Sequence, residues 1–316
     1  MKTRRTFLKI SLGALVSTLA GTSALAATPA RELRIGNQKG YLSLLKGRGT
    51  LEQRLAPLGV NVRWTEFTAG PVQLEALNVG SIDFGDVGEA PPIFAQAAGA
   101  PLAYVAATVQ RPQSEAVLVP RQSSVHGVED LKGKRIALNK GSNVHYFLVE
   151  LLRQHGLRYT DVNLVFLSPA DARAAFENAS VDAWAIWDPF YAAAEGALGA
   201  RKLADATGVV GNRAYYFSSL DYARKNPDVI RILIEELGKI DDWGSRNRAA
   251  LSAELAALWG LPVNVVSAAI DRTQFGTGPI THAILGEQQK IADTFFDLGL
   301  LPRRVNVFEA SVPGIA

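Results

Sequence analysis

The sequence predicts an α/β protein with two similar series of alternating strands and helices. Short apolar runs alternate with amphipathic stretches over residues 32–119 and again over residues 135–187. Repeated strand–helix units of this kind form parallel-rich sheets that are flanked by helices on both faces. Residues 34–40 and 135–141 match in residue type at most positions, and each opens one series. The match indicates a common plan for the two halves without requiring a duplication.

The first series is made of short strands separated by helices. Its apolar runs are four to eight residues long, as is typical of buried strands, and the stretches between them have helical spacing. Strands are expected at residues 33–36, 60–67, 82–87, 103–108 and 115–119, and helices at residues 51–58, 71–79 and 91–98.

The second series ends in a run of helices. Ser168, Pro169 and Asp171 favour a helix start, because the hydroxyl can cap free N–H groups, proline suits the first turn and the carboxylate meets the helix dipole. After residue 217 the strand signals fade. Strands are expected at residues 135–138, 162–167 and 181–187, and helices at residues 144–155, from 169, and at 227–245, 248–259, 262–271 and 282–298.

The first 26 residues have the features of a cleaved export signal. Arg4 and Arg5 precede an apolar run over residues 10–21 that is too short to span a membrane, and residues 24–26 have the small-x-small pattern of a cleavage site. The pattern resembles a twin-arginine signal, which implies export of a folded chain. A frayed N-terminal helix is the alternative interpretation of these residues.

Composition excludes several functions. Loss of the signal removes four positive charges, so the formal net charge falls from +3 to −1 and nucleic acid is not expected as a partner. The chain has no cysteine, which excludes disulfides, thiolate nucleophiles, iron–sulfur clusters and a lipid-anchor cysteine. We expect no cofactor, no metal and no membrane insertion after cleavage.

Candidate binding residues are expected where strands lead into helices. In such sheets, ligands collect at the carboxyl ends of strands, next to unpaired helix N–H groups. Around Gly141, Ser142 and Asn143, the backbone N–H groups and the Ser142 hydroxyl favour an oxyanion. The alternative is that Ser142 or Asn143 only caps the helix. His145 either adds a donor or serves packing.

Two further loops carry polar or glycine residues at strand ends. Gln38 supplies donors and an acceptor, and Gly40 permits a close backbone approach; a plain polar turn is the alternative. Gly88 and Glu89 precede another helix start. Glu89 either caps that helix or faces the ligand.

The strand over residues 181–187 is expected to contribute an indole ring and a carboxylate. Strand alternation places Trp184, Ile186 and Asp188 on one face and Trp187 on the other. We therefore expect Trp184 and Asp188 to line the ligand site and Trp187 to pack in the core. A helix cap is the alternative role for Asp188, which precedes Pro189.

These loops together resemble the aliphatic-sulfonate-binding proteins of bacterial ABC importers, a group with taurine- and nitrate-binding relatives. The likeness spans about residues 32–304. Its most specific run is Val181-Asp182-Ala183-Trp184-Ala185-Ile186-Trp187-Asp188-Pro189. The other segments that carry the likeness are residues 38–40, 69–71, 74–83, 91–100, 130–133 and 169–176. The chain departs from the family pattern at Glu89 and at Asn143-Val144.

The resemblance implies a bilobed periplasmic-binding-protein fold of type II-like architecture, with the ligand cleft between the lobes. Lobe I would comprise residues 27–118 and 218–316, lobe II residues 119–217, with hinge crossings near residues 119 and 217. It also implies a periplasmic receptor that delivers an alkanesulfonate, a small organic anion, to the membrane permease of an ABC importer for sulfur acquisition.

Other functions remain compatible with this fold. Taurine, nitrate or a pyrimidine precursor could occupy the same cleft, and a receptor that mainly signals would use the same pocket. Some relatives of the fold are enzymes. A cysteine nucleophile is absent here, and the four histidines lack metal-ligand spacing, so no catalytic residue is assigned.

Overall fold

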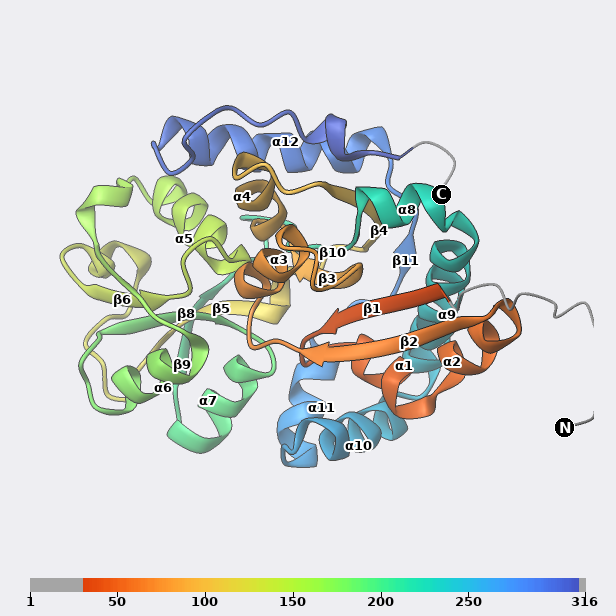
Figure 1. The fold of residues 1–316 in the computed structure, drawn as a ribbon. Helices are drawn as coiled ribbons and strands as arrows, with labels where there is room; N and C mark the ends of the chain where they lie inside the picture. The colour runs from red at the N-terminus through yellow and green to blue at the C-terminus, as the bar shows by residue number, and fades with distance from the viewer. Residues whose placement is uncertain (1–30, 313–316) are drawn as a thin grey trace, which may run out of the picture. The chain divides into compact units, whose positions relative to one another are not determined.

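The computed structural model describes residues Arg31–Val312 (Figure 1). The expected export signal and its cleavage site lie outside the described residues. The described chain forms two mixed sheets flanked by helices, which confirms the predicted α/β fold with two lobes. No helix within residues 31–312 is both long and apolar enough to cross a membrane.

The first sheet has six strands in the order β11-β4-β10-β3-β1-β2. β1 pairs in parallel with β2 and β3, whereas β10 runs antiparallel to β3 and β4. The strands are β1 (Arg31–Asn37), β2 (Val60–Glu66), β3 (Phe84–Gly88), β4 (Leu102–Thr108), β10 (Ala214–Ser219) and β11 (Thr277–Gly278).

The second sheet has five strands in the order β7-β6-β8-β5-β9. β6 pairs in parallel with β7 and β8, and β5 runs antiparallel to β8 and β9. Both sheets are therefore less uniformly parallel than the strand–helix pattern indicates. The strands are β5 (Glu115–Val119), β6 (Arg135–Leu138), β7 (Asn163–Phe166), β8 (Ala183–Trp187) and β9 (Arg201–Asp205).

Helices cover both faces of each sheet. Those of the first lobe are α1 (Leu42–Arg48), α2 (Thr50–Leu55), α3 (Gly70–Asn78), α4 (Pro91–Ala97), α8 (Leu220–Lys225), α9 (Pro227–Arg246), α10 (Arg248–Trp259), α11 (Val263–Asp271) and α12 (His282–Asp297). Those of the second lobe are α5 (Asn143–Gln154), α6 (Pro169–Glu177) and α7 (Phe190–Leu198). Short 3-10 turns lie at Ala56–Leu58, Pro112–Ser114, Val128–Leu131, Tyr159–Asp161 and Val307–Ala310.

Each sheet separates two apolar cores, because alternate residues of a strand point to opposite faces. In the first sheet, Ile35 packs with the helices α1, α2 and α9, and Val87 packs on the other face with α3, α4 and α12. In the second sheet, Ala185 and Trp184 divide in the same way between the α5 side and the α6–α7 side. A strand residue whose side chain reaches the cleft must therefore lie at a strand end.

The chain passes between the sheets twice. It leaves β4 at Thr108 and enters β5 at Glu115, and it returns between Asp205 and Ala214. Crossings were expected near residues 119 and 217, but these two positions lie in the strands β5 and β10, and the chain crosses just before each strand. Both strands that follow a crossing, β5 and β10, enter their sheets antiparallel to a neighbour. Entry from the other lobe explains why the sheets are mixed.

The two lobes also touch on either side of the crossings. Ala192 of α7 packs against Val265 and Ala269 of α11. The ring of Phe295 in α12 lies 5.4 Å from that of His145 in α5, and Figure 1 shows α12 running past α4 toward α5. These contacts bound the space between the sheets.

Candidate functional site

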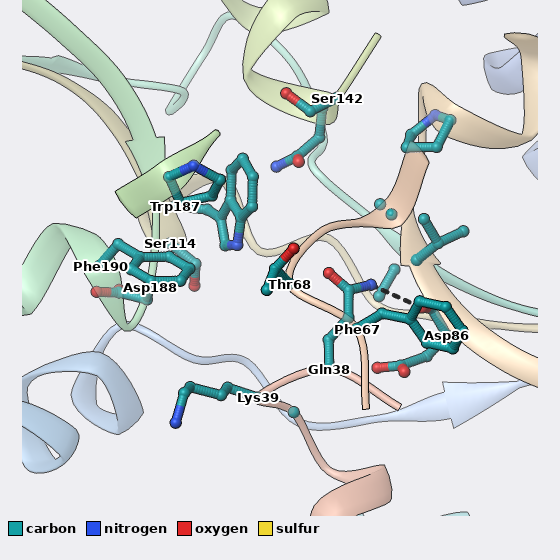
Figure 2. A pocket seen from close by; sticks show the side chains of 18 of the residues that line it. Gln38, Lys39, Phe67, Thr68, Asp86, Ser114, Ser142, Trp187, Asp188 and Phe190 are labelled. Atoms are coloured by element: carbon teal, nitrogen blue, oxygen red, sulfur yellow. Dashed lines mark hydrogen bonds between the residues drawn. The ribbon is translucent and has the colours of Figure 1, made fainter. Parts of the chain in front are cut away.

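A cavity of about 370 Å³ lies between the two sheets (Figure 2). The first lobe contributes the loops that follow β1 and β2 and the end of β3, and the second contributes the starts of α5 and α6 and the end of β8. Both crossings line it as well, through Arg111 and Ser114 in one and Asn212 and Arg213 in the other. Its volume suits a small molecule.

The N-terminus of α5 forms one wall. Ser142 precedes the helix in an extended backbone conformation, and no side chain caps the helix. The Ser142 hydroxyl instead donates to the carbonyl of Asn139 at 2.7 Å, so the capping alternative does not describe it. Ser142 and Asn143 both line the cavity. A helix N-terminus of this kind favours an anion through its N–H groups and dipole.

Asn143 connects this wall to both crossings. Its side-chain amide donates to Oε2 of Glu115 at 2.5 Å and to Oδ1 of Asn212 at 3.1 Å. Glu115 is fully buried, and Asn212 lies in the second crossing. The amide therefore supplies a donor to one oxygen of a buried carboxyl group, whose other oxygen, Oε1, has no hydrogen-bond partner among the described residues. It also links the start of α5 to both crossings.

His145 holds the loop before α5 rather than lining the cavity. Its ring is fully buried, and Nδ1 accepts the N–H of Gly141 at 3.2 Å. Nε2 lies 2.8 Å from the hydroxyl of Tyr159. Burial, helped by Lys140, lowers the pKa of His145 to about 4, so the ring is neutral at pH 7. Gly141 also lies outside the lining residues, and its left-handed φ of 73° turns the chain into α5.

On the first lobe, Gln38 and Gly40 line the cavity beside Asp86. The Gln38 amide donates to Oε1 of Gln73 at 2.9 Å and to the carbonyl of Asp86 at 3.0 Å. These bonds hold the loop after β1 against β3. Gln38 is therefore more than a solvent-facing polar turn.

Glu89 lies behind the cavity, which corrects both roles expected for it. Only 4% of the residue is exposed, and Oε2 accepts the N–H of Arg213 at 3.2 Å. Burial raises the pKa of Glu89 to about 7. Asp86, Val87 and Gly88 of β3 line the cavity, and Asp86 is the carboxylate among them. Glu89 follows the end of β3 and is not part of the pairing between β3 and β10.

The two tryptophans of β8 have the reverse of the expected positions. Trp184 is 1% exposed and packs in the core against Phe176, with ring centroids 5.9 Å apart. Trp187 lines the cavity. Alternation assigns each residue to a face of the sheet, and helices cover both faces. Because Trp187 is the last residue of β8, its ring reaches the cavity from the strand end.

Asp188 has both of the roles considered for it. It lines the cavity, and Oδ1 accepts the N–H of Ala192 in the first turn of α7 at 3.0 Å. The same oxygen lies 3.1 Å from Nη1 of Arg272, which follows α11 in the first lobe. Burial raises the pKa of Asp188 to about 6, although Arg272 opposes this shift.

Sequence reasoning missed two arginines in the cavity wall. Arg111 lies over the ring of Tyr41, with its Cζ 5.0 Å from the ring centroid, and its Nε donates to the carbonyl of Gln274 at 2.8 Å. Arg213 donates from Nη1 to the carbonyl of Thr108 at 2.8 Å. Both lie in the crossings, so a search of strand ends alone could not find them. Within residues 31–312 no acidic and histidine side chains gather as a metal site.

Gly88 allows the two lobes to approach. A Cβ at this position would lie 2.9 Å from the Cβ of Asn143, closer than carbon atoms pack. The end of β3 in the first lobe can therefore meet the start of α5 in the second only while residue 88 lacks a side chain.

Gly88→Ala should weaken ligand binding about tenfold or more, because opening of the lobes relieves the clash at a cost typical of overpacking. The free energy of unfolding should change by less than about 1 kcal/mol, since each lobe keeps its own core. Calorimetric titration and urea unfolding measure the two effects. Gly286→Ala is the control, because a Cβ there meets open space. Equal affinities for both variants would contradict this role.

The buried pair Glu89 and Glu115 predicts a pH-dependent stability. Burial raises the pKa of each, and Glu89 raises that of Glu115 further. The folded chain thus binds protons that the unfolded chain has already released above about pH 4.5, and this pair's contribution to stability falls as pH rises toward 7 and beyond.

Glu89→Gln should therefore gain stability relative to the parent chain as pH rises from 5 to 8, by on the order of 1 to 3 kcal/mol. Comparing the two chains cancels the opposing titration of His145. Urea unfolding at both pH values measures the difference. The exposed Glu75→Gln should show none. A pH-independent difference for Glu89→Gln would mean that the residue is ionised in the fold.

Comparisons with known proteins agree with this architecture. A family model described as NMT1/THI5 like matches residues 57–239. The alkanesulfonate-binding protein SsuA from Xanthomonas axonopodis pv. citri, solved bound to MOPS, is 43% identical, with a TM-score of 0.85 over 91% of this chain and 99% of that one. The periplasmic aliphatic sulphonate binding protein SsuA from Escherichia coli is 41% identical, with a TM-score of 0.82 over 89% and 97%.

A more distant likeness shows that the fold alone does not separate binding from catalysis. The desulfurization enzyme DszB is 17% identical, with a TM-score of 0.66 over 90% of this chain and 97% of that one. At this identity only the fold is shared. Function must be argued from the residues of the cavity.

Proposed function

Because the chain belongs to the NMT1/THI5-like family, we propose that it is an exported receptor that binds an aliphatic sulfonate between its lobes. It would deliver this ligand to the permease of an ABC importer for sulfur acquisition. The observation that carries the proposal is the cavity wall at Ser142 and Asn143, where an uncapped helix N-terminus faces the cavity between the lobes. The 43% identity to an alkanesulfonate-binding protein over nearly the full chain supports the same ligand class.

The cavity has the two properties that a sulfonate with an alkyl group needs. The start of α5 offers backbone N–H groups to an ionised oxyanion without a metal ion. Phe67, Trp187 and Phe190 line the same space and offer apolar surface to an alkyl chain (Figure 2). Nitrate has no alkyl group for this surface, which favours a sulfonate over nitrate.

Binding rather than catalysis is the role that these residues support. The enzyme alternative would need a nucleophile or an acid–base pair in the cavity, and the full sequence contains no cysteine. His145, the one histidine among the candidate residues, is buried away from the cavity and held neutral. We therefore assign no catalytic residue.

Export and delivery complete the proposal. The arginine pair and apolar run of residues 1–26 support transfer to the periplasm by the twin-arginine route, followed by cleavage after Ala26. Accumulation of uncleaved precursor in cells that lack this translocase would support the route, and normal export there would contradict it. The permease partner follows from the proposed receptor role.

A melting-shift screen tests the ligand class. A ligand that binds only the folded chain raises its stability, by about 2.7 kcal/mol at a hundredfold excess over Kd. Alkanesulfonates should raise the melting temperature of the mature chain, whereas sulfate, nitrate and pyrimidines should not. A shift with nitrate or a pyrimidine and none with any sulfonate would replace the proposed function.

The two tryptophans of β8 should respond differently to substitution. Trp187→Ala should weaken binding of longer alkanesulfonates most, because each buried CH₂ contributes about 0.8 kcal/mol. Trp184→Ala should instead leave a core cavity and lower the free energy of unfolding by roughly 3 to 5 kcal/mol. Titration over a chain-length series and urea unfolding separate the effects. A chain-length dependence unchanged in Trp187→Ala would remove this ring from the binding wall.

A further inference from the structure

Asp86 is a cavity carboxyl group without an adequate partner. It lies on β3 and lines the cavity, and Figure 2 shows its carboxyl group on the same side as Gln38. Oδ1 is buried and has no hydrogen-bond partner among the described residues. Oδ2 lies beside Gly40, 3.0 Å from where a Cβ of that residue would stand. Burial raises the pKa of Asp86 to about 7, and Arg111 only partly opposes this shift.

The other two acidic residues of the cavity wall, Asp188 and Glu66, are either hydrogen-bonded or exposed to water. Asp188 already receives the Ala192 N–H and pairs with Arg272. Glu66 is exposed to water at the end of β2. Burying a carboxyl group without hydrogen-bond donors is costly. Because the protein covers Oδ1, a donor on a ligand can reach this carboxyl group only at Oδ2, which lies beside Gly40 and is not among the buried oxygens. Asp86 is therefore the acid with capacity left for a ligand.

A sulfonate group cannot satisfy Asp86, because its oxygens only accept hydrogen bonds and carry negative charge. The helix N-terminus at Ser142 lies in the other lobe, across the cavity from Asp86 (Figure 2). A ligand that reaches both walls would thus need an anionic end and a donor end. An ammonium group supplies donors and a positive charge together, which a hydroxyl group does not.

The charges of the cavity wall fit such a ligand. The lining residues include three acids, Glu66, Asp86 and Asp188, and three bases, Lys39, Arg111 and Arg213. Their formal charges cancel. A net positive wall would favour a simple anion, whereas a balanced wall favours a ligand whose own charges are separated and cancel.

We propose that the cavity selects sulfonates that carry an ammonium group, with Asp86 as the residue that pairs with the ammonium. This inference rests on the proposed sulfonate-binding function and narrows its ligand class. Asp86 is a specificity-determining residue in this scheme, and the α5 N-terminus supplies affinity common to all sulfonates. The order of affinity should be amine, then hydroxyl, then unsubstituted alkane, at equal chain length.

The test compares three ligands of equal length on the mature chain. Propanesulfonate, 3-hydroxypropanesulfonate and 3-aminopropanesulfonate are titrated calorimetrically at pH 8, where Asp86 is ionised. The amine should bind about tenfold or more tightly than the alkane, as expected for one charge-assisted hydrogen bond. Asp86→Asn should abolish this preference, so that the variant binds the amine and the alkane with about equal affinity. Glu66→Gln, the matched control, should keep the preference.

Each contrary outcome has a distinct meaning. Equal binding of amine and alkane by the parent chain, or a preference that survives in Asp86→Asn, overturns the inference and leaves the proposed function standing. Loss of the preference in Glu66→Gln alone also overturns it. No binding of any sulfonate refutes the proposed function itself. Melting curves verify folding, and Asp86→Ser serves as a second variant if Asp86→Asn does not fold.

Discussion

The arrangement of the site depends on the buried amide of Asn143. This side chain donates to Glu115 at the start of β5 and to Asn212 in the return crossing, and it belongs to the first turn of α5. The hydrogen bond from the Asn143 amide opposes the pKa rise that burial and Glu89 cause at Glu115, so the amide lowers the cost of burying this carboxyl group. One side chain thereby ties a helix N-terminus to both connections between the lobes. Moving α5 relative to the crossings would break these bonds.

The lobes also contact each other on either side of Asn143. One contact is apolar and the other is polar. Near α12, the rings of His145 and Phe295 pack in an apolar contact. Near α11, Arg272 joins the lobes through Asp188 and Glu195, and its guanidinium lies 3.7 Å from the ring centroid of Tyr191. The energy of the apolar contact depends mainly on the distance between the rings, whereas the energy of the hydrogen bonds from Arg272 also depends on their direction. The polar side therefore fixes the relative orientation of the lobes, while the apolar side tolerates small displacements.

Local sequence patterns were sufficient for the fold class and for most elements. Strands such as β6 and helices such as α5 and α12 have strong periodicity, and the structure has them close to the expected bounds. The antiparallel entries of β5 and β10 depend on where the chain returns from the other lobe, which no local pattern records. The short strands β9 and β11 gain their hydrogen bonds only from partners elsewhere in the chain.

The site was only partly accessible to the same reasoning. Strand ends identified Gln38, Ser142, Asn143 and Asp188, because topology alone gathers such positions at one edge. Which individual side chain points into the cavity was harder to predict. Trp184 and Trp187 were exchanged because alternation distinguishes two faces of a sheet but not its end. Glu89 was named as a candidate and Asp86 was not, although Asp86 lines the cavity and Glu89 is buried behind it.

The missed residues have a consequence for how the protein selects a ligand. Arg111 and Arg213 lie in the two crossings, which belong to neither sheet. Any change in the angle between the lobes must move these segments, because they are the only covalent connections between the two sheets within residues 31–312. Two of the positive charges in the cavity wall are thus carried by the segments that connect the lobes. In the proposed receptor, ligand selection and lobe closure would therefore share residues, and exchanging loops at the strand ends alone would transfer only part of the specificity.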